Sequence, residues 1–286
     1  MSRIAYVNGT YRPHRVASVH VEDRGYQFAD GIYEVVLVCG GRLVDEEPHL
    51  DRLDRSLREM RIEPPMARVP LRLVLREVLR RNRLHDGLLY LQVTRGVARR
   101  DHPFPDAATP PALVVTAKRL VLPDRETSEK GIGVITIPDI RWERCDIKTI
   151  ALVPSVLGKQ QAREAGAGEA WLVADDGTVT EGTSTNAWIV TGEGALVTRD
   201  TSHAILAGVT RARVLAIARM NGLAFEERPF TVEEAQSARE AFLTSATSFV
   251  KPVTRIDDRV IGNGRAGSFT LQLFDAYMDH ARGVGT

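Results

Sequence analysis

Apolar and polar positions alternate as in β-strands at both ends of the first 120 residues and follow a helical period between them. Asn8-Gly9 lies between alternating residues, which predicts a β-hairpin. A second pair of strands is predicted to turn at Gly40-Gly41. Two segments place apolar residues at helical spacing with charges opposite, and each predicts an amphipathic helix. The strand-like runs are 4–12, 31–44, 88–96 and 111–120, and the helical runs are 46–60 and 68–84.

The second half of the chain mixes strand-like and helical runs in a less regular order. Asp176-Gly177 predicts a tight turn between two strands, so Glu181 is expected on the returning strand just past that turn. A helix that begins in the small residues AGVTR and stops at Gly222 is expected to expose backbone N–H groups at its start. The other runs predict strands at 133–140 and 242–250, a hairpin at 255–264, and helices at 156–167 and from about Ser268.

The length of 286 residues exceeds the usual size of one domain and favours two. The polar segment LPDRETSEKG, which carries Pro123 and Gly131, is the best linker candidate. We therefore expect an N-terminal α/β domain at 1–121 and a C-terminal domain at 122–286.

Composition excludes several classes of partner. A formal net charge of +1 gives no general attraction for nucleic acid or for an anionic membrane surface. The first residues lack the apolar core of a signal peptide, and no apolar run is long enough to span a bilayer. The two cysteines form no CxxC pair, and the seven histidines are too scattered for a metal site to be proposed. We expect a cytoplasmic protein that has no metal site and does not bind a membrane.

The stretch RCDIKTIALV contains Lys148 in a chain that uses lysine sparingly. There are five lysines among 38 basic residues, which leaves 38 − 5 = 33 arginines. A lysine amine becomes a nucleophile when burial or nearby cations disfavour its ammonium form, and it can then form a Schiff base. An ammonium that reaches water from the end of a strand is the commoner situation for any single lysine. Lys251 in SFVKPV shares the apolar context, so local sequence leaves both lysines open.

Several motifs in fixed order carry a resemblance to a known family. DRGYQFADGIYE, HLDRL, RCDIKTIALV, TVTEGTSTN, GVTR and TSATS together resemble the fold-type IV pyridoxal phosphate enzymes. VTRGVARRDHPFP is similar to the corresponding run of the D-amino-acid aminotransferases. The resemblance implies a two-domain α/β (α+β) protein with pyridoxal 5′-phosphate between a small N-terminal and a larger C-terminal domain, acting as a homodimer.

The resemblance also implies which residues hold the cofactor. Lys148 matches the Schiff-base lysine that moves a proton between the substrate α-carbon and the cofactor. Glu181 matches the acid that pairs with the pyridine nitrogen. Arg52 matches the arginine on the phosphate, where its planar fork suits phosphate oxygens. The other matches are Val209 and Thr210 at a phosphate-binding helix start, Ser245 and Ala246 in a second phosphate-binding turn, and Leu206 against the ring.

One position departs from the family pattern. Ala246 stands where the D-amino-acid enzymes are expected to have a threonine hydroxyl. The phosphate contact expected there must therefore come from a backbone N–H or from Thr247.

Substrate choice is expected to rest on three other residues. Arg100 and His102 in VARRDH match the family's Arg-x-His pair, which together with Tyr33 grips the α-carboxylate of a free amino acid. Because the bond that breaks must stand perpendicular to the cofactor ring, the side on which the carboxylate is held decides which enantiomer reacts. In the family this arrangement selects D-amino acids.

The resulting hypothesis is a ping-pong transaminase that moves the amino group of a D-amino acid such as D-alanine to a 2-oxo acid such as 2-oxoglutarate. Alternatives with the same fold are a branched-chain L-amino-acid transaminase, an (R)-amine transaminase and an aminodeoxychorismate lyase. Arg100-x-His102 argues against each of them. A protein that binds the cofactor without turnover is the alternative from another class, and in such a protein a carboxylate-binding pair would be idle.

Overall fold

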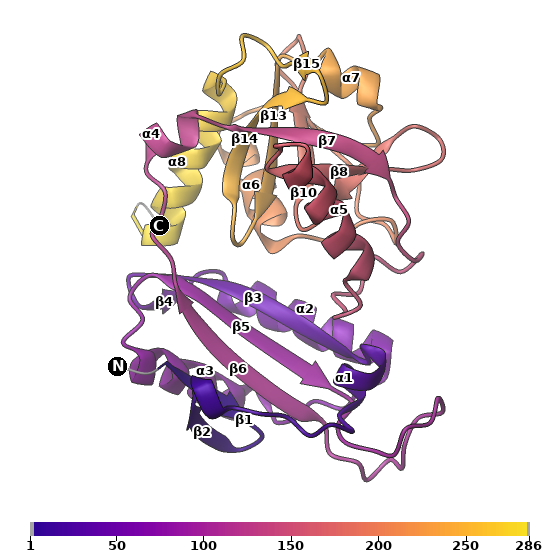
Figure 1. Cartoon of the computed structure of the whole chain (residues 1–286). Coiled ribbons are helices and arrows are strands. Elements are labelled where there is room, and N and C mark those ends of the chain that lie inside the picture. Colours follow the sequence, from indigo (N-terminus) through magenta and orange to yellow (C-terminus); the bar gives the residue numbers. More distant parts are fainter. Residues whose placement is uncertain (1–2, 285–286) are drawn as a thin grey trace. The chain divides into compact units, whose positions relative to one another are not determined.

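The computed structural model describes residues 3–284 and divides the chain into two compact units. The first unit comprises the residues up to Leu122 together with Ile147–Ala151, and the second comprises Pro123–Asp146 and the residues from Leu152 onward (Figure 1). The sequence assigned Ile147–Ala151 to the C-terminal domain. Their backbone contacts place them with the first unit instead.

The first unit is built on an antiparallel six-stranded sheet in the order β2-β1-β6-β5-β3-β4. The predicted hairpin at Asn8-Gly9 joins β1 to β2, and the predicted turn at Gly40-Gly41 joins β3 to β4. All four turn residues have positive φ, the conformation that Asn and Gly tolerate best. The strands are β1 (Ile4–Val7), β2 (Thr10–Pro13), β3 (Gly31–Cys39), β4 (Arg42–Leu43), β5 (Gly87–Thr94) and β6 (Ala112–Arg119).

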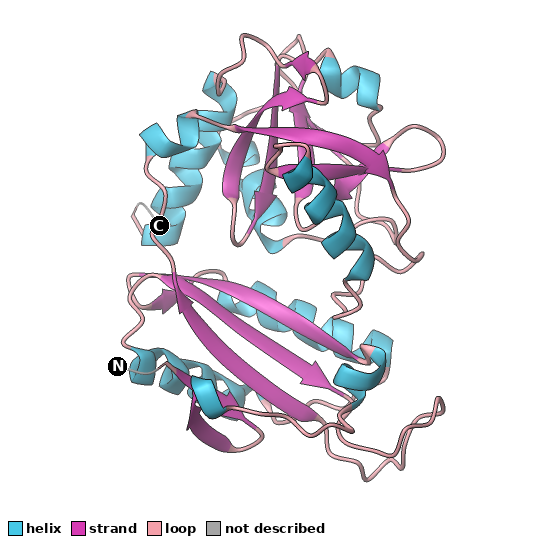
Figure 2. Ribbon diagram, in the orientation of Figure 1, coloured by secondary structure: helices cyan, strands magenta, loops and turns pink. Residues whose placement is uncertain are grey.

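Helices α2 (Glu46–Met60) and α3 (Arg68–Asn82) pack against one face of this sheet (Figure 2). Both coincide closely with the predicted amphipathic segments. Each ends at an arginine in the left-handed conformation, Arg61 and Arg83 respectively, where the capping N–H groups turn back onto the last carbonyls. A short helix, α1 (Arg24–Phe28), and a 3₁₀ turn, η1 (His14–Val16), precede β3. The buried core includes Leu50, Leu53, Leu57, Leu75, Val78, Leu89 and Leu91.

The segment Ile147–Ala151 lies beside the start of β3. Tyr33 donates its backbone N–H to the Lys148 carbonyl at 3.0 Å, and Ile150 donates to the Gly31 carbonyl at 3.1 Å. A β-carbon at Gly31 would lie 2.6 Å from the Val93 carbonyl oxygen, so glycine permits the close packing of this strand start. These contacts join five residues from far along the sequence to the first unit.

The second unit contains a mixed nine-stranded sheet in the order β12-β11-β10-β13-β14-β7-β8-β9, with β15 paired to β14. The pairs β11–β12, β14–β7 and β7–β8 are parallel, and the others are antiparallel. Its strands are β7 (Ile132–Pro138), β8 (Glu169–Val173), β9 (Val179–Gly182), β10 (Asn186–Val190), β11 (Leu196–Thr198), β12 (Phe225–Glu227), β13 (Glu240–Ser245), β14 (Phe249–Ile256) and β15 (Arg259–Val260).

Five helices accompany this sheet: α4 (Arg125–Glu129), α5 (Val153–Glu164), α6 (Val209–Met220), α7 (Val232–Gln236) and α8 (Ser268–Arg282). Helix α5 begins three residues before the prediction, because Pro154 fits the first turn, where its missing N–H costs no bond. The core of the unit gathers Trp171, Phe230, Leu243 and Ile256. Across residues 3–284 no helix is both long and apolar enough to cross a bilayer.

Candidate active site

Lys148 is half-buried in the segment that borders β3, and its ammonium faces an aromatic ring. The Nζ atom lies 4.3 Å from the centroid of the Tyr33 ring. The Lys148 backbone is fixed by the bond from Tyr33 N–H and by its own N–H, which donates to Ser56 Oγ at 3.4 Å. The structure thus brings together two residues that the sequence assigned to the cofactor and to the substrate.

Tyr33 is supported from the neighbouring strand. Its ring stacks on Tyr90 of β5 with the centroids 5.7 Å apart. The Tyr90 hydroxyl donates to Gln92 Oε1 at 2.7 Å, and burial together with the neighbouring Tyr33 raises the pKa of Tyr90 to about 12. Tyr90 therefore stays a neutral donor at physiological pH, and the stack restrains the Tyr33 ring.

Arg52 forms a buried ion pair with Glu34. From α2 it donates through Nε to Glu34 Oε1 at 2.7 Å and through Nη2 to Oε2 at 2.8 Å. His49, one helical turn earlier, contacts the same carboxylate through Nδ1 at 2.8 Å. Strand alternation puts Glu34 on the opposite face of β3 from Tyr33. The arginine predicted to bind phosphate is therefore held in a fixed orientation by a fully buried acid.

The electrostatics of this cluster fix its protonation state. Burial raises the pKa of Glu34, but Arg52 and His49 outweigh burial and bring it to about 2. Burial lowers the pKa of His49, as do Arg52 and Lys148, and the opposing effect of Glu34 does not cancel them. His49 is therefore neutral with its proton on Nδ1, because an ionised carboxylate can only accept. Arg52 and Lys148, the two cations of this unit predicted to bind the cofactor, both lower the pKa of His49.

Arg100 and His102 lie on an exposed loop against α1. The Arg100 guanidinium carbon is 4.6 Å from the centroid of the Phe28 ring, and Nη1 donates to the Gln27 carbonyl at 3.4 Å. The His102 ring lies 5.5 Å from the same Phe28 ring. Phe28 thus brings the predicted Arg-x-His pair together, whereas the contacts of Tyr33 are with Lys148 and Tyr90.

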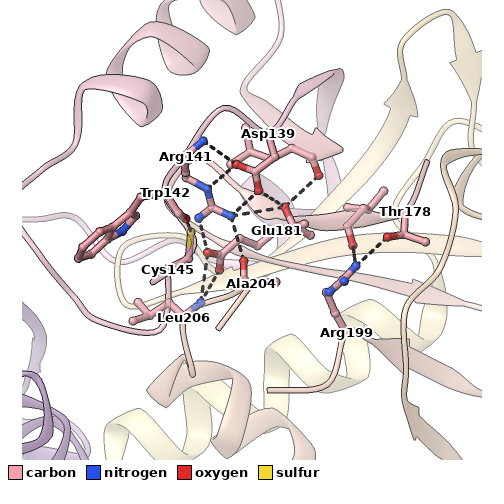
Figure 3. A network of polar contacts seen from close by, with 12 residues as sticks. Asp139, Arg141, Trp142, Cys145, Thr178, Glu181, Arg199, Ala204 and Leu206 are labelled. Carbon is pink, nitrogen blue, oxygen red and sulfur yellow. Dashed lines mark hydrogen bonds and ion pairs between the residues drawn. The ribbon is translucent and has the colours of Figure 1, made fainter. Parts of the chain in front are cut away.

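Glu181 lies on β9 of the second unit, as predicted, with its carboxylate surrounded by donors (Figure 3). Arg141 Nη1 donates to Oε1 at 2.5 Å, and Asn186 Nδ2 donates to Oε2 at 3.0 Å. The backbone N–H of Leu206 lies 3.2 Å from both oxygens. The acid is buried, and it is held by contacts from three separate segments.

Arg141 is itself clamped by a second acid. Its Nε donates to Asp139 Oδ1 at 2.9 Å and its Nη2 donates to Oδ2 at 2.8 Å, while Thr180 Oγ1 donates to Oδ2 at 2.7 Å (Figure 3). Burial raises the pKa of Asp139, but Arg141 and Thr180 outweigh it and leave that pKa lowered. Burial also raises the pKa of the adjacent Cys145 thiol to about 11, so this cysteine stays protonated. Glu181 thus faces a guanidinium whose charge is shared with Asp139.

The first turn of α6 carries two residues that the sequence assigned to the cofactor phosphate. Val209 and Thr210 form its first turn, which carries no acidic residue, and Gly208 caps it without a side-chain bond. A β-carbon at Gly208 would lie 2.0 Å from Asn186 Oδ1, so any larger residue there would displace the Asn186 side chain. Asn186 also donates to the Leu206 carbonyl at 2.9 Å. The helix start, Leu206 and Glu181 are therefore connected through one asparagine.

Ser245 and Ala246 lie at the turn between β13 and β14. The Ser245 hydroxyl accepts from the backbone N–H of Ser248 at 3.0 Å and lies 3.1 Å from the Thr247 hydroxyl. Antiparallel pairing sets Thr244 opposite Asn186, so this turn follows directly after the residue beside Asn186. Thr247, which was expected to replace the missing threonine hydroxyl unless a backbone N–H does so, is exposed at the turn.

Several residues of these networks were not predicted, among them Glu34, His49, Arg141 and Asn186. Glu34 left a signal, because a charged residue interrupts the apolar strand GIYEVVLV. An acid at a position that alternation buries requires a partner. Arg141 and Asn186 left none, since the sequence shows neither their burial nor their partners.

Comparison with known proteins identifies the family. Residues 31–256 match the family described as amino-transferase class IV. The chain belongs to that family. It is 41% identical over 263 residues to a D-alanine aminotransferase of Bacillus licheniformis, covering 92% of each chain. It is 38% identical over 272 residues to one of Staphylococcus haemolyticus, covering 95% of each.

Solved structures agree on the fold. The T.th. branched-chain amino acid aminotransferase with pyridoxamine 5′-phosphate superposes with a TM-score of 0.90 at 26% identity, covering 99% of this chain and 95% of that one. The predicted α/β fold-type IV architecture is confirmed.

Proposed function

We propose that this class IV aminotransferase is a pyridoxal-phosphate-dependent D-amino-acid transaminase, moving the amino group of a donor such as D-alanine to a 2-oxo acid such as 2-oxoglutarate. The observation that carries the chemistry is the placement of Lys148, half-buried with Nζ 4.3 Å from the Tyr33 ring centroid. The choice of D-amino acids is supported by the D-alanine aminotransferases of 41% and 38% identity that align over nearly the whole chain.

The residues present fit the cofactor. A phosphate needs a fixed cation and free backbone donors, and Arg52 and the start of α6 are of these types. A pyridine nitrogen that must stay protonated needs an acid held in place, and Glu181 has three donors around it. When bound, pyridoxal phosphate supplies an electron sink and carries the amino group between donor and acceptor.

The side chains supply binding and proton transfer. Lys148 would hold the cofactor through Nζ, and as a free amine it would take the proton from the substrate α-carbon. Glu34 and His49 hold the Arg52 guanidinium in one orientation, so that its remaining N–H groups would bind phosphate without reorganising. Arg141 and Asn186 hold the Glu181 carboxylate in place. Leu206, Val209, Thr210, Ser245 and Ala246 complete the proposed cofactor contacts.

The substrate carboxylate is proposed to bind Arg100, His102 and Tyr33. Guanidinium, imidazole and phenol together provide the charge and the donors that a desolvated carboxylate requires. An amine without a carboxylate would leave these groups unused.

A homodimer in the cytoplasm is part of the proposal. Helix α5 exposes Val153, Val156 and Leu157 by 70%, 62% and 52% at one helical spacing, and Ile140 and Trp142 are exposed as well. Such an apolar face suits burial against another subunit. Light scattering tests the assembly, and Val156→Glu should shift it toward the monomer.

A panel of amino donors tests the activity. The enzyme with pyridoxal phosphate is given D-alanine, L-leucine and an (R)-amine with 2-oxoglutarate, and pyruvate and glutamate are measured. We expect turnover with D-alanine and formation of D-glutamate. L-Leucine as the preferred donor would instead favour the branched-chain alternative, which the T.th. structure represents at 26% identity.

A further inference from the structure

Arg24 of the motif DRGYQFADG is almost fully buried, although it lies in a five-residue helix. Its Nε donates to Asp30 Oδ2 at 2.8 Å. Arg95, just past the end of β5, grips the same carboxylate through Nε at 2.8 Å and Nη2 at 2.9 Å. Burial raises the pKa of Asp30, but Arg95 and Arg24 outweigh it and leave that pKa lowered. Arg24 is therefore fixed at one end by an ionised acid.

The other end of Arg24 reaches the loop that carries Arg100 and His102. Nη1 donates to the Asp101 carbonyl at 2.7 Å, and Nη2 donates to the His102 carbonyl at 3.3 Å. A guanidinium is planar and rigid, so its orientation toward Asp30 also sets the position of these two carbonyls. The backbone between the two predicted substrate-binding side chains is thus tied to the buried interior.

Aromatic contacts hold the same loop on either side of this bond. The Phe28 ring has the Arg24 guanidinium carbon 4.9 Å and the Arg100 guanidinium carbon 4.6 Å from its centroid. Further on, Phe104 lies between Arg95 at 3.6 Å and Arg61 at 4.8 Å. Residues 99–104 are all exposed and without regular secondary structure, so these side-chain contacts hold the loop against the rest of the unit.

We propose that Arg24 is a positioning residue for substrate binding, which holds the backbone at Asp101 and His102 so that Arg100 and His102 present a preformed carboxylate site. The inference rests on the proposed function, because it assigns the carboxylate to these two side chains. Without Arg24 the loop must be ordered when substrate binds. The conformational entropy lost in ordering it weakens the affinity for substrate. The proton transfer at Lys148 is unaffected by this change.

The experiment compares Arg24→Gln with wild type in single-turnover half-reactions with D-alanine, using enzyme loaded with pyridoxal phosphate. We expect the apparent dissociation constant of D-alanine to rise about tenfold and the limiting rate to stay within about twofold. Arg24→Lys keeps a cation beside Asp30 but cannot span both carbonyls. Its dissociation constant for D-alanine should therefore lie between those of wild type and Arg24→Gln. Arg68→Gln is the control for the loss of an arginine outside the loop, since it removes more exposed ion pairs to Asp51 and Asp54 on α2.

A coupling test separates positioning from general loosening. In a background of Arg100→Ala and His102→Ala, Arg24→Gln should raise the dissociation constant by no more than about twofold, because no side chain remains to be positioned. A tenfold rise in that background would overturn the inference. The same rise in Arg68→Gln would also overturn it.

Hydrogen exchange gives a readout that needs no turnover. The amides of residues 99–102 and of Phe104 should exchange at least about tenfold faster in Arg24→Gln than in wild type or Arg68→Gln. Unchanged exchange would contradict the inference alone. A wild type that does not turn over D-alanine would contradict the proposed function, and the substrate role of Arg24 with it. The two failures are thus distinguishable.

Discussion

The ammonium of Lys148 lies 4.3 Å from the centroid of the Tyr33 ring, and the Lys148 carbonyl accepts the Tyr33 backbone N–H at 3.0 Å. The two residues are 115 positions apart in the sequence (148 − 33). Backbone pairing and a cation–π contact therefore fix the lysine and the tyrosine as one unit. Any movement at the start of β3 would therefore displace both Lys148, the proposed base, and Tyr33, one of the proposed ligands of the substrate carboxylate.

The first prediction concerns the covalent link. Borohydride reduction of the enzyme loaded with pyridoxal phosphate should leave a stable adduct on the peptide that contains Lys148, detected by mass spectrometry. Lys148→Ala should abolish turnover. Lys251→Ala is the control, because Lys251 is half-buried in β14 and burial lowers the pKa of its amine. An adduct on Lys251 would show that the assignment of Lys148 is wrong.

The second prediction concerns Glu181. Glu181→Gln should retain the cofactor, because Arg52 and the start of α6 are unchanged, but it should slow removal of the α-proton by about tenfold or more, since a neutral amide no longer stabilises a protonated ring nitrogen. Single-turnover spectra with α-deuterated and unlabelled D-alanine measure this step. Arg141→Gln should slow the same step less. An unchanged rate in Glu181→Gln would rule out its assigned role.

Local sequence signals predicted much of the fold, because these elements are determined by interactions between residues close together in the sequence. Asn8-Gly9 has the backbone preference that a two-residue hairpin requires, and the apolar stripe of 46–60 matches α2 at Glu46–Met60. Glu181 was placed on its strand by the turn at Asp176-Gly177. Each of these features depends on residues only a few positions apart.

The remaining features depend on contacts that sequence spacing does not encode. Lys148 was expected in the C-terminal domain, because its segment follows the linker, yet its backbone pairs with β3. Glu34 needs Arg52 and His49 from another element to be stable when buried. Arg24 bonds to carbonyls 77 and 78 residues away. Burial and the identity of a side chain's partners depend on tertiary structure. The motif HLDRL therefore singled out Arg52 but not Glu34, the acid that orients it.

The third prediction concerns the buried acid Glu34. Its pKa of about 2 lies below the ordinary 4.5, so its contribution to stability is complete above pH 4.5 and is lost as the pH falls toward 2. Glu34→Gln should lower the free energy of unfolding at pH 7 by about 2 kcal/mol or more, since Arg52 loses its buried partner. The difference from wild type should shrink below pH 4.5. Urea unfolding at a series of pH values measures it.

Glu77 provides the control for this acid. Its pKa is also lowered to about 2, by Arg80 and Arg81, but the ion pairs lie on the exposed surface of α3. Exposed pairs contribute little, so Glu77→Gln should change stability much less than Glu34→Gln. Equal effects would mean that burial of the Glu34 cluster does not determine its contribution. Cofactor affinity should fall in Glu34→Gln alone.

The last prediction concerns the proposed carboxylate ligands. Arg100→Ala removes a charge-assisted contact, so kcat/KM should fall about tenfold to hundredfold for D-alanine and for the 2-oxo acid alike. His102→Ala should lower both values less, because a neutral donor contributes less than a guanidinium. Any activity toward an (R)-amine should change little, since that substrate has no carboxylate for Arg100 to bind. If amine and amino acid lost activity equally, Arg100 would instead be supporting the loop through Phe28, and the selection of D-amino acids would need another residue.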